Sequence, residues 1–179
     1  MYRRPVSDSE APPRARWLWP LVWAISIYLT SSAFISNVQL AQTVKTVSAG
    51  HVEATAFENF WKFTWWIFVK GWHATEFGIL AWFCSRAWKA RHAWWSIPCA
   101  YAVADEFHQL FVRYRGGRFS DVLIDWLGVL AFAAFAGKIR LSKLGWGVGV
   151  VVWLLLLMAL SYFPFGMPRL GGGASRFAP

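Results

Sequence analysis

The chain has 179 residues, of which 57% are hydrophobic, 19% aromatic and only 15% charged, with a formal net charge of +9. An ordinary soluble domain is about half apolar and about a quarter charged, and a domain this short cannot bury so much apolar surface. The composition therefore excludes an ordinary soluble domain and a disordered chain, and it favours a membrane protein.

The first predicted element is a membrane-spanning helix over residues 17–36, which contain no charged residue. A helix needs about 20 apolar residues to cross a bilayer. Residues 1–16 form a basic tail whose arginines predict a cytoplasmic N-terminus, because Lys and Arg concentrate on the inner side of membranes. The alternative is a cleaved secretory signal ending near Ser31-Ser32-Ala33.

The polar segment 37–59 follows, and we expect it outside the membrane. Its sequence indicates no secure fold. A helix lying on the membrane surface is one interpretation, since Trp61, Trp65 and Trp66 come where aromatic residues gather at an interface.

Four further apolar runs complete a predicted all-α bundle of about five transmembrane helices. A sheet is excluded because open sheet edges are not found in lipid. The odd number of spans predicts that the loop 138–143 is cytoplasmic and that the turn 113–118 and the C-terminus are outside. Together, residues 17–163 form one transmembrane domain, followed by a flexible tail over 164–179. The four further spans are predicted at about 63–85, 93–112, 119–137 and 144–163.

The remaining composition argues against several other classes of protein. Cys84 and Cys99 both lie in apolar runs, so we interpret them as small hydrophobic residues and not as a disulfide. The basic residues are distributed over the ends of the spans, so no nucleic-acid partner is predicted. No HExxH or CxxC spacing is present, and neither a metal nor a cofactor is predicted.

Acidic residues within the predicted spans are the most informative feature. An Asp at the centre of a membrane helix costs roughly 2.5–3.5 kcal/mol, and such residues usually serve a function. Helical spacing puts Glu106 and Gln109 on one face of the third span and Asp121 and Asp125 on one face of the fourth. The acids concerned are Glu76, Asp105, Glu106, Asp121 and Asp125.

The basic turn from Arg113 to Arg118 makes the third and fourth spans antiparallel neighbours, so their polar faces can meet. Arg115 is then placed to pair with a carboxylate through two hydrogen bonds. The predicted polar cluster, or ligand site, consists of Lys70, His73, Glu76, Glu106, Gln109, Arg113, Arg115, Arg118, Asp121 and Asp125.

These motifs resemble those of the VanZ-like membrane proteins. The matching positions are Lys70-x-x-His73, Glu106-x-x-Gln109, Arg115, Asp121-Val122, Asp125 and Gly128. The chain departs from the family pattern in three places: Asp125 replaces the usual Asn, Val69 stands where an acid commonly precedes the Lys, and the turn lacks its usual Pro.

The resemblance implies a multi-pass protein of the bacterial cytoplasmic membrane that belongs to the cell envelope. It also implies a link to low-level antibiotic resistance of the teicoplanin type. We therefore hypothesise an outward-facing polar pocket that binds an anionic membrane lipid, a lipid-linked envelope precursor or a lipoglycopeptide. The arginines of the turn would hold a phosphate or carboxylate, the acids would fix their geometry, and Lys70 and His73 would close the site.

Three other interpretations remain open from the sequence. The first is an enzyme acting on a lipid-linked phosphodiester, with Glu106 or His73 as general base and Arg115 as charge stabiliser. The second is a small transporter or proton relay, since acids and His within spans also mark ion paths. The third is a salt-bridge network that only supports the fold. The oligomeric state cannot be derived from the sequence.

Overall fold

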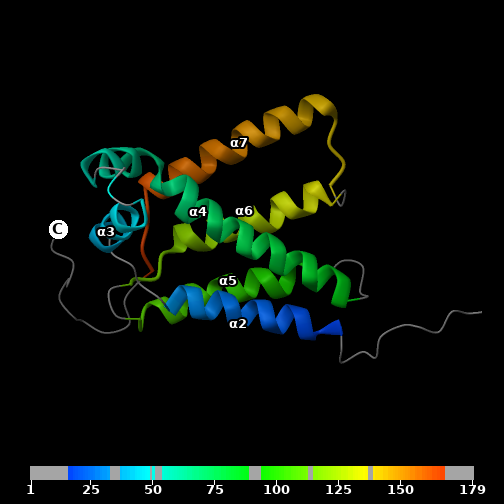
Figure 1. Cartoon of the computed structure of the whole chain (residues 1–179). Helices are drawn as coiled ribbons and strands as arrows, with labels where there is room; N and C mark the ends of the chain where they lie inside the picture. The colour runs from blue at the N-terminus through cyan, green and yellow to red at the C-terminus, as the bar shows by residue number, and fades with distance from the viewer. Residues whose placement is uncertain are drawn as a thin grey trace, which may run out of the picture.

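The computed structural model describes residues 16–32, 37–48, 50, 54–88, 94–112, 115–136 and 139–167. Apart from one isolated bridge, these residues form helices, turns and irregular segments, so the all-α prediction is confirmed. The helices, labelled as in Figure 1, are α2 (Leu18–Ser32), α3 (Asn37–Val47), α4 (Ala54–Ala87), α5 (Ser96–Gln109), α6 (Phe119–Phe135) and α7 (Lys143–Tyr162).

Helix α4 is the centre of the bundle, because it packs against each of the other described helices and most extensively against α6. Figure 1 shows α2 and α5 on one side of α4 and α7 on the other. The contact between α4 and α6 is close because Gly78 and Gly128 lie at the crossing. A Cβ atom on Gly128 would overlap the backbone oxygen of Ala74, so only glycine allows the two backbones to approach this far.

The helix boundaries differ from the predicted spans in two places. Helix α4 begins at Ala54, nine residues before the predicted start at 63, and the preceding segment contains α3, where the sequence indicated no secure fold. Helix α5 has 14 residues, which corresponds to about 21 Å and is shorter than the predicted span 93–112. The polar residues Asp105, Glu106 and Gln109 occupy its last turn and are held by side-chain contacts described below.

One described helix, α7, is long and apolar enough by itself to cross a membrane. It has 20 residues, and only 11% of its most apolar stretch is buried inside the molecule. An apolar helix left this exposed is unfavourable in water, so α7 indicates a membrane protein. Helices α2 and α5 are shorter, and α4, although long, is interrupted by polar residues such as Lys70, His73 and Glu76. The five-span bundle therefore stays a prediction.

The first residues of the predicted flexible tail are bound to the molecule. Residues 164–167 run beside the turn before α6: Phe165 O accepts hydrogen bonds from Phe119 N at 3.0 Å and Ser120 N at 3.4 Å, and Met167 N donates to Gly117 O at 3.2 Å. These residues of the predicted tail are therefore hydrogen-bonded to the turn before α6. The remainder, 168–179, lies outside the described residues.

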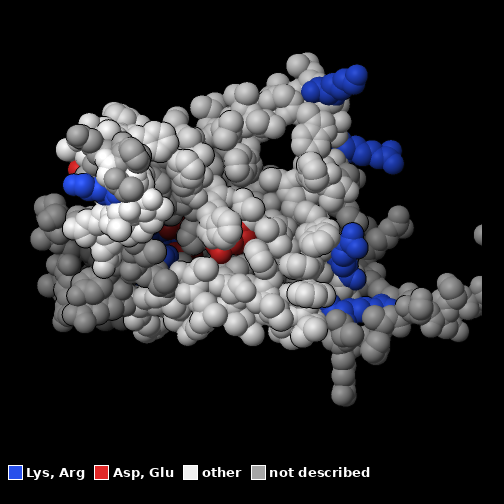
Figure 2. All heavy atoms as spheres, viewed as in Figure 1, with Lys and Arg blue, Asp and Glu red and all other residues white. Residues whose placement is uncertain are grey.

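One end of the bundle has basic residues and no acidic residue among the described residues. Arg16 precedes α2, Arg86 lies in the last turn of α4, Arg140 lies in the α6–α7 connection, and Lys143 begins α7. Because the successive helices α2, α4, α5, α6 and α7 alternate in direction, these positions all fall at the same end. Figure 2 shows Lys and Arg side chains along that end. Basic residues also lie at the other end, at Lys45, Lys62, Arg115 and Arg118, so the two ends differ in their acidic residues and not in their number of Lys and Arg.

Candidate functional site

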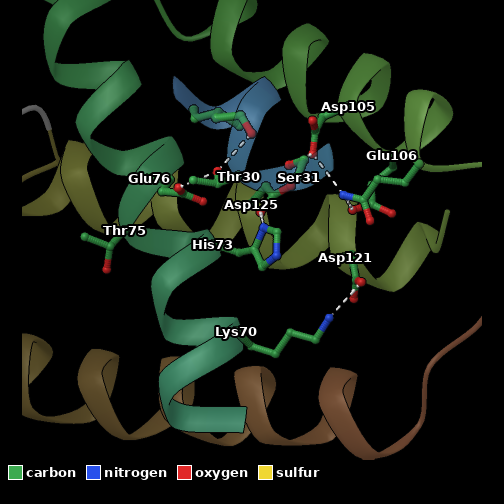
Figure 3. A network of polar contacts seen from close by, with 12 residues as sticks. Thr30, Ser31, Lys70, His73, Thr75, Glu76, Asp105, Glu106, Asp121 and Asp125 are labelled. Carbon is green, nitrogen blue, oxygen red and sulfur yellow. Dashed lines mark hydrogen bonds and ion pairs between the residues drawn. The ribbon is translucent and has the colours of Figure 1, made fainter. Parts of the chain in front are cut away.

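The opposite half of the bundle contains a buried group of polar side chains, here called the polar cluster. Its members come from α4, α5 and α6 and face one another in the interior (Figure 3). Each is 9% exposed or less, and Glu106 and Asp125 are completely buried. The polar cluster consists of Lys70, His73, Glu76, Asp105, Glu106, Gln109, Asp121 and Asp125.

The structure brings together most of the residues that the sequence assigned to this site. Seven of the predicted residues are members of the polar cluster, namely Lys70, His73, Glu76, Glu106, Gln109, Asp121 and Asp125. Arg115 and Arg118 lie on the adjoining turn, where Arg115 is half-buried and Arg118 is exposed. Arg113 lies outside the described residues.

Lys70 and Asp121 form a buried ion pair between α4 and α6. Lys70 Nζ lies 2.7 Å from Asp121 Oδ2, and both side chains are almost fully buried. Asp121 is also in the first turn of α6, where the positive end of the helix dipole favours a carboxylate. The sequence analysis expected Lys70 to close the site, and the structure places it on Asp121. The pairing of Arg115 with a carboxylate stays a prediction.

Glu106 forms a hydrogen bond to the backbone of the basic turn. Its Oε2 accepts a hydrogen bond from the backbone N–H of Arg118 at 2.8 Å, and its Oε1 accepts from Gln109 Nε2 at 2.9 Å. Gln109 Oε1 in turn accepts from Arg115 Nη1 at 3.4 Å. A Cβ atom on Gly117 would overlap the backbone oxygen of Glu106, so glycine allows the turn to lie against the end of α5. Glu106 thus binds the backbone of the turn.

Three successive hydroxyl groups of α2 connect this helix to polar side chains of α4 and α5. Thr30 Oγ1 donates to Glu76 Oε1 at 3.1 Å, and Ser31 Oγ donates to Asp105 Oδ2 at 2.8 Å. Ser32 Oγ lies 3.1 Å from His108 Nε2. The sequence analysis did not assign these hydroxyls or Asp105 to the site. The feature of the sequence that could have indicated these contacts is the run of three hydroxyl residues at the end of an otherwise apolar helix.

Several buried atoms of the polar cluster have no hydrogen-bond partner among the described residues. They include both carboxylate oxygens of Asp125, one oxygen each of Asp105 and Asp121, and Nδ1 of His73. His73 Nδ1 lies 3.9 Å from Asp125 Oδ1, which is too long for a hydrogen bond. Buried polar atoms are normally paired, so these acceptors indicate a place where a hydrogen-bond donor fits.

The charges within the polar cluster are unequal, with five carboxyl groups and a single lysine. Such a collection is expensive to bury unless its members are paired. Within the part of the chain that the structure describes, no three His, Cys, Asp or Glu side chains are grouped so as to hold a metal ion. The unpartnered carboxylate oxygens of Asp105, Asp121 and Asp125 could accept hydrogen bonds from hydroxyl or ammonium groups.

Comparison with known proteins gives one match. The family model described as VanZ/LLP1 matches residues 17–140, which include α2 to α6 and the whole polar cluster. No curated protein and no solved structure matches the chain.

Proposed function

The chain belongs to the VanZ/LLP1 family, and from this membership and the geometry of the site we propose that it is a multi-pass protein of the bacterial cytoplasmic membrane that binds an anionic amphiphile at its outer face. The amphiphile is an anionic lipid, a lipid-linked envelope precursor or a lipoglycopeptide. The last of these would connect the protein to resistance of the teicoplanin type.

The orientation in the membrane is supported by the residues on either side of α2. Four arginines precede this helix and no Lys or Arg follows it until Lys45, so the end of the bundle at which α2 begins would be cytoplasmic. The polar cluster and the turn 115–118 lie towards the other end, which would then face outwards. The exposed apolar surface of α2 and α7 supports contact with lipid.

Cysteine labelling tests this orientation. Gly116→Cys and Ser142→Cys would each be introduced into a chain in which Cys84 and Cys99 are replaced by Ala. We expect a membrane-impermeant maleimide to label position 116 in intact cells and position 142 only after the membrane is opened. Labelling of position 142 in intact cells, with position 116 protected, contradicts the proposed orientation.

The observation that carries the ligand proposal is the way in which Glu106 supports the basic turn. Its carboxylate, fully buried, accepts from the backbone of Arg118, and the Arg118 side chain is exposed. A guanidinium on a turn with a fixed backbone suits an anion, because its planar fork forms two parallel hydrogen bonds to a phosphate or carboxylate. Arg115, which is oriented by Gln109, supplies a second guanidinium three residues away.

The unpartnered oxygens favour a ligand that also donates hydrogen bonds. Asp121 and His73 are 8% and 9% exposed and retain some access to the surface, and each has a buried atom without a partner. A lipid-linked precursor and a lipoglycopeptide both combine an anionic group with hydroxyl groups. These two therefore fit the polar cluster better than an anionic lipid whose head group carries no hydroxyl group.

The test of the ligand proposal is Arg115→Lys, measured with undecaprenyl phosphate in detergent micelles as the probe. Lysine keeps the charge but not the two-point contact, so we expect weaker binding with an unchanged melting temperature. Lys45→Arg, an exchange at an exposed position of α3, is the control and should bind as the wild type does. Unchanged binding by Arg115→Lys together with a lower melting temperature would make the arginine part of the scaffold.

The proton-relay alternative is less well supported than binding. A relay needs polar groups through the whole thickness of the bundle. Beyond Glu76, the buried residues of α4 are Phe77, Leu80, Ala81, Cys84 and Ala87, and none of these side chains forms a proton-conducting chain.

A further inference from the structure

A large groove lies between α4, α6 and α7, away from the polar cluster. Its volume is about 1070 Å³, and Figure 2 shows it as an opening beneath α7. Thr75 lines the groove, and Figure 3 shows that this side chain points away from the polar cluster. The close contact between Gly78 and Gly128 separates the two sites.

The wall of the groove is almost entirely hydrocarbon and aromatic. Among its described lining residues, the one hydroxyl belongs to Thr75, and it donates to Gly71 O of its own helix at 2.7 Å. The indole N–H of Trp153 is also used, because it donates to Leu127 O at 3.0 Å. The groove therefore favours an apolar occupant.

One end of the groove has a basic rim, formed by Arg86, Arg140 and Lys143. The guanidinium carbon of Arg86 lies 4.8 Å from the centroid of the Trp82 ring, which lines the groove. Arg140 lies between two lining residues, Ile139 and Leu141, and Lys143 follows shortly after. All three basic residues are exposed, and the described residues from 77 to 88 and from 126 to 167 include no Asp or Glu.

We propose that this groove binds an acyl chain of an anionic phospholipid, with the phosphate of that lipid at the basic rim. The inference rests on the proposed membrane location and is independent of the ligand of the polar cluster. Lipid chains surround a membrane protein at high concentration and are as apolar as the wall of the groove. Basic pockets between helices on the cytoplasmic side are typical sites for anionic head groups.

Charge favours a lipid over a second copy of the chain as the occupant. In a symmetric dimer the same surface patch of both copies is used, so two basic rims would be brought together. No acidic residue of the described part of that end would offset the repulsion. An anionic lipid instead brings the opposite charge to the rim and hydrocarbon to the groove.

Gly149→Leu tests the groove, and Gly147→Leu is a matched control two residues earlier on α7. Gly149 lines the groove, and a Cβ atom added there would have no neighbour nearer than 4.0 Å, so a leucine would fill the space. Gly147 is exposed, has no neighbour within 4 Å and is not part of the lining. Both changes give α7 the same gain in helix propensity and apolar surface.

The measurement is native mass spectrometry of the full chain after equilibration with equal amounts of dioleoyl phosphatidylglycerol and dioleoyl phosphatidylcholine in mild detergent. We expect the wild type and Gly147→Leu to retain phosphatidylglycerol several-fold more than phosphatidylcholine, and Gly149→Leu to lose most of the retained lipid. Equal retention by the two variants overturns the proposal, and so does a dimer without lipid.

The rim is tested separately with the double variant Arg140→Gln/Lys143→Gln. It should still retain lipid, but without the preference for phosphatidylglycerol, because the groove remains while the charge is gone. The control is Lys45→Gln/Lys62→Gln, which removes the same charge elsewhere and should keep the preference. An unchanged preference in the rim variant contradicts the proposal even if Gly149→Leu does not fold. If the polar cluster binds no ligand, all of these expectations remain the same.

Discussion

The two halves of the bundle interior are built by the same three helices in opposite ways. Towards the turn 115–118, α4, α5 and α6 bury the polar cluster. Towards the basic end, they bury an apolar half made of Phe77, Leu80, Ala81, Cys84, Ala102, Val129 and Ala133. Helix α4 changes from one kind of interior to the other between Glu76 and Phe77.

The two halves differ in what they contribute to the stability of the fold. Apolar packing is non-directional and tolerates exchanges of similar volume. A buried carboxylate must be matched by donors of fixed position, and buried ion pairs add little net stability compared with well-packed apolar residues. The polar half therefore adds little net stability for the cost of burying its charges, and the proposed binding function would account for that cost.

The largest effect is expected in the polar half, from Lys70→Met. This change removes the cation 2.7 Å from Asp121 and leaves a buried carboxylate without its partner, which typically costs about 3–5 kcal/mol. Adding Asp121→Asn should recover most of that loss, so the double variant is more stable than the sum of the single changes predicts. Thermal unfolding followed by circular dichroism measures all three. Additive losses would mean that the pair is not coupled.

Leu80→Ala measures how much the packing of the apolar half contributes to the free energy of unfolding, again by thermal unfolding. Leu80 is 1% exposed in the core, and truncating a buried leucine costs about 2–5 kcal/mol. The control is Leu80→Met, which keeps the volume and should cost less than about 1.5 kcal/mol. Neither change should alter binding of undecaprenyl phosphate once the variants are compared well below their melting temperatures. Reduced binding by Leu80→Met would show that the two halves are not separable.

The smallest effect is expected where α2 meets the polar cluster. Ser31→Ala removes the hydrogen bond to Asp105 Oδ2, but that oxygen still accepts from Gln109 Nε2 at 3.0 Å, so the expected loss is about 0.5–1.5 kcal/mol. Ser26→Ala is the control on the same helix, since Ser26 Oγ donates only to Val22 O of its own helix and is exposed. Equal melting temperatures of Ser31→Ala and Ser26→Ala would show that the hydrogen bond from α2 to Asp105 does not contribute to stability.

The sequence predicted the helices from runs of apolar residues, and it failed where polar contacts set the ends. Helix α7, charge-free between Leu144 and Phe163, was predicted to within one residue at each end. Helix α4 begins well before its apolar run, because a helix can continue through polar residues wherever no proline or glycine stops it. That extension, over 54–62, contains Phe57, Phe60 and Trp61, but polar residues interrupt them, so it forms no continuous apolar run.

The candidate site was predicted better in membership than in pairing. Helical spacing is enough to put Glu106 beside Gln109 and Asp121 beside Asp125 on single faces. Which cation reaches which carboxylate depends on how α4 crosses α6, and that crossing is set by the contact of Gly128 with the Ala74 backbone. Long-range geometry of this kind leaves no local pattern, so the pairing of Lys70 with Asp121 could not be read from spacing.

Whether the polar cluster serves binding or only the fold is tested most directly by the double variant Lys70→Met/Asp121→Asn. Its affinity for undecaprenyl phosphate in detergent micelles would be measured beside its melting temperature and compared with the wild type. We predict a melting temperature close to that of the wild type and binding that is largely lost, because the site keeps its packing without the charges of this ion pair. Restored stability together with full binding would contradict the account and leave the polar cluster as scaffold.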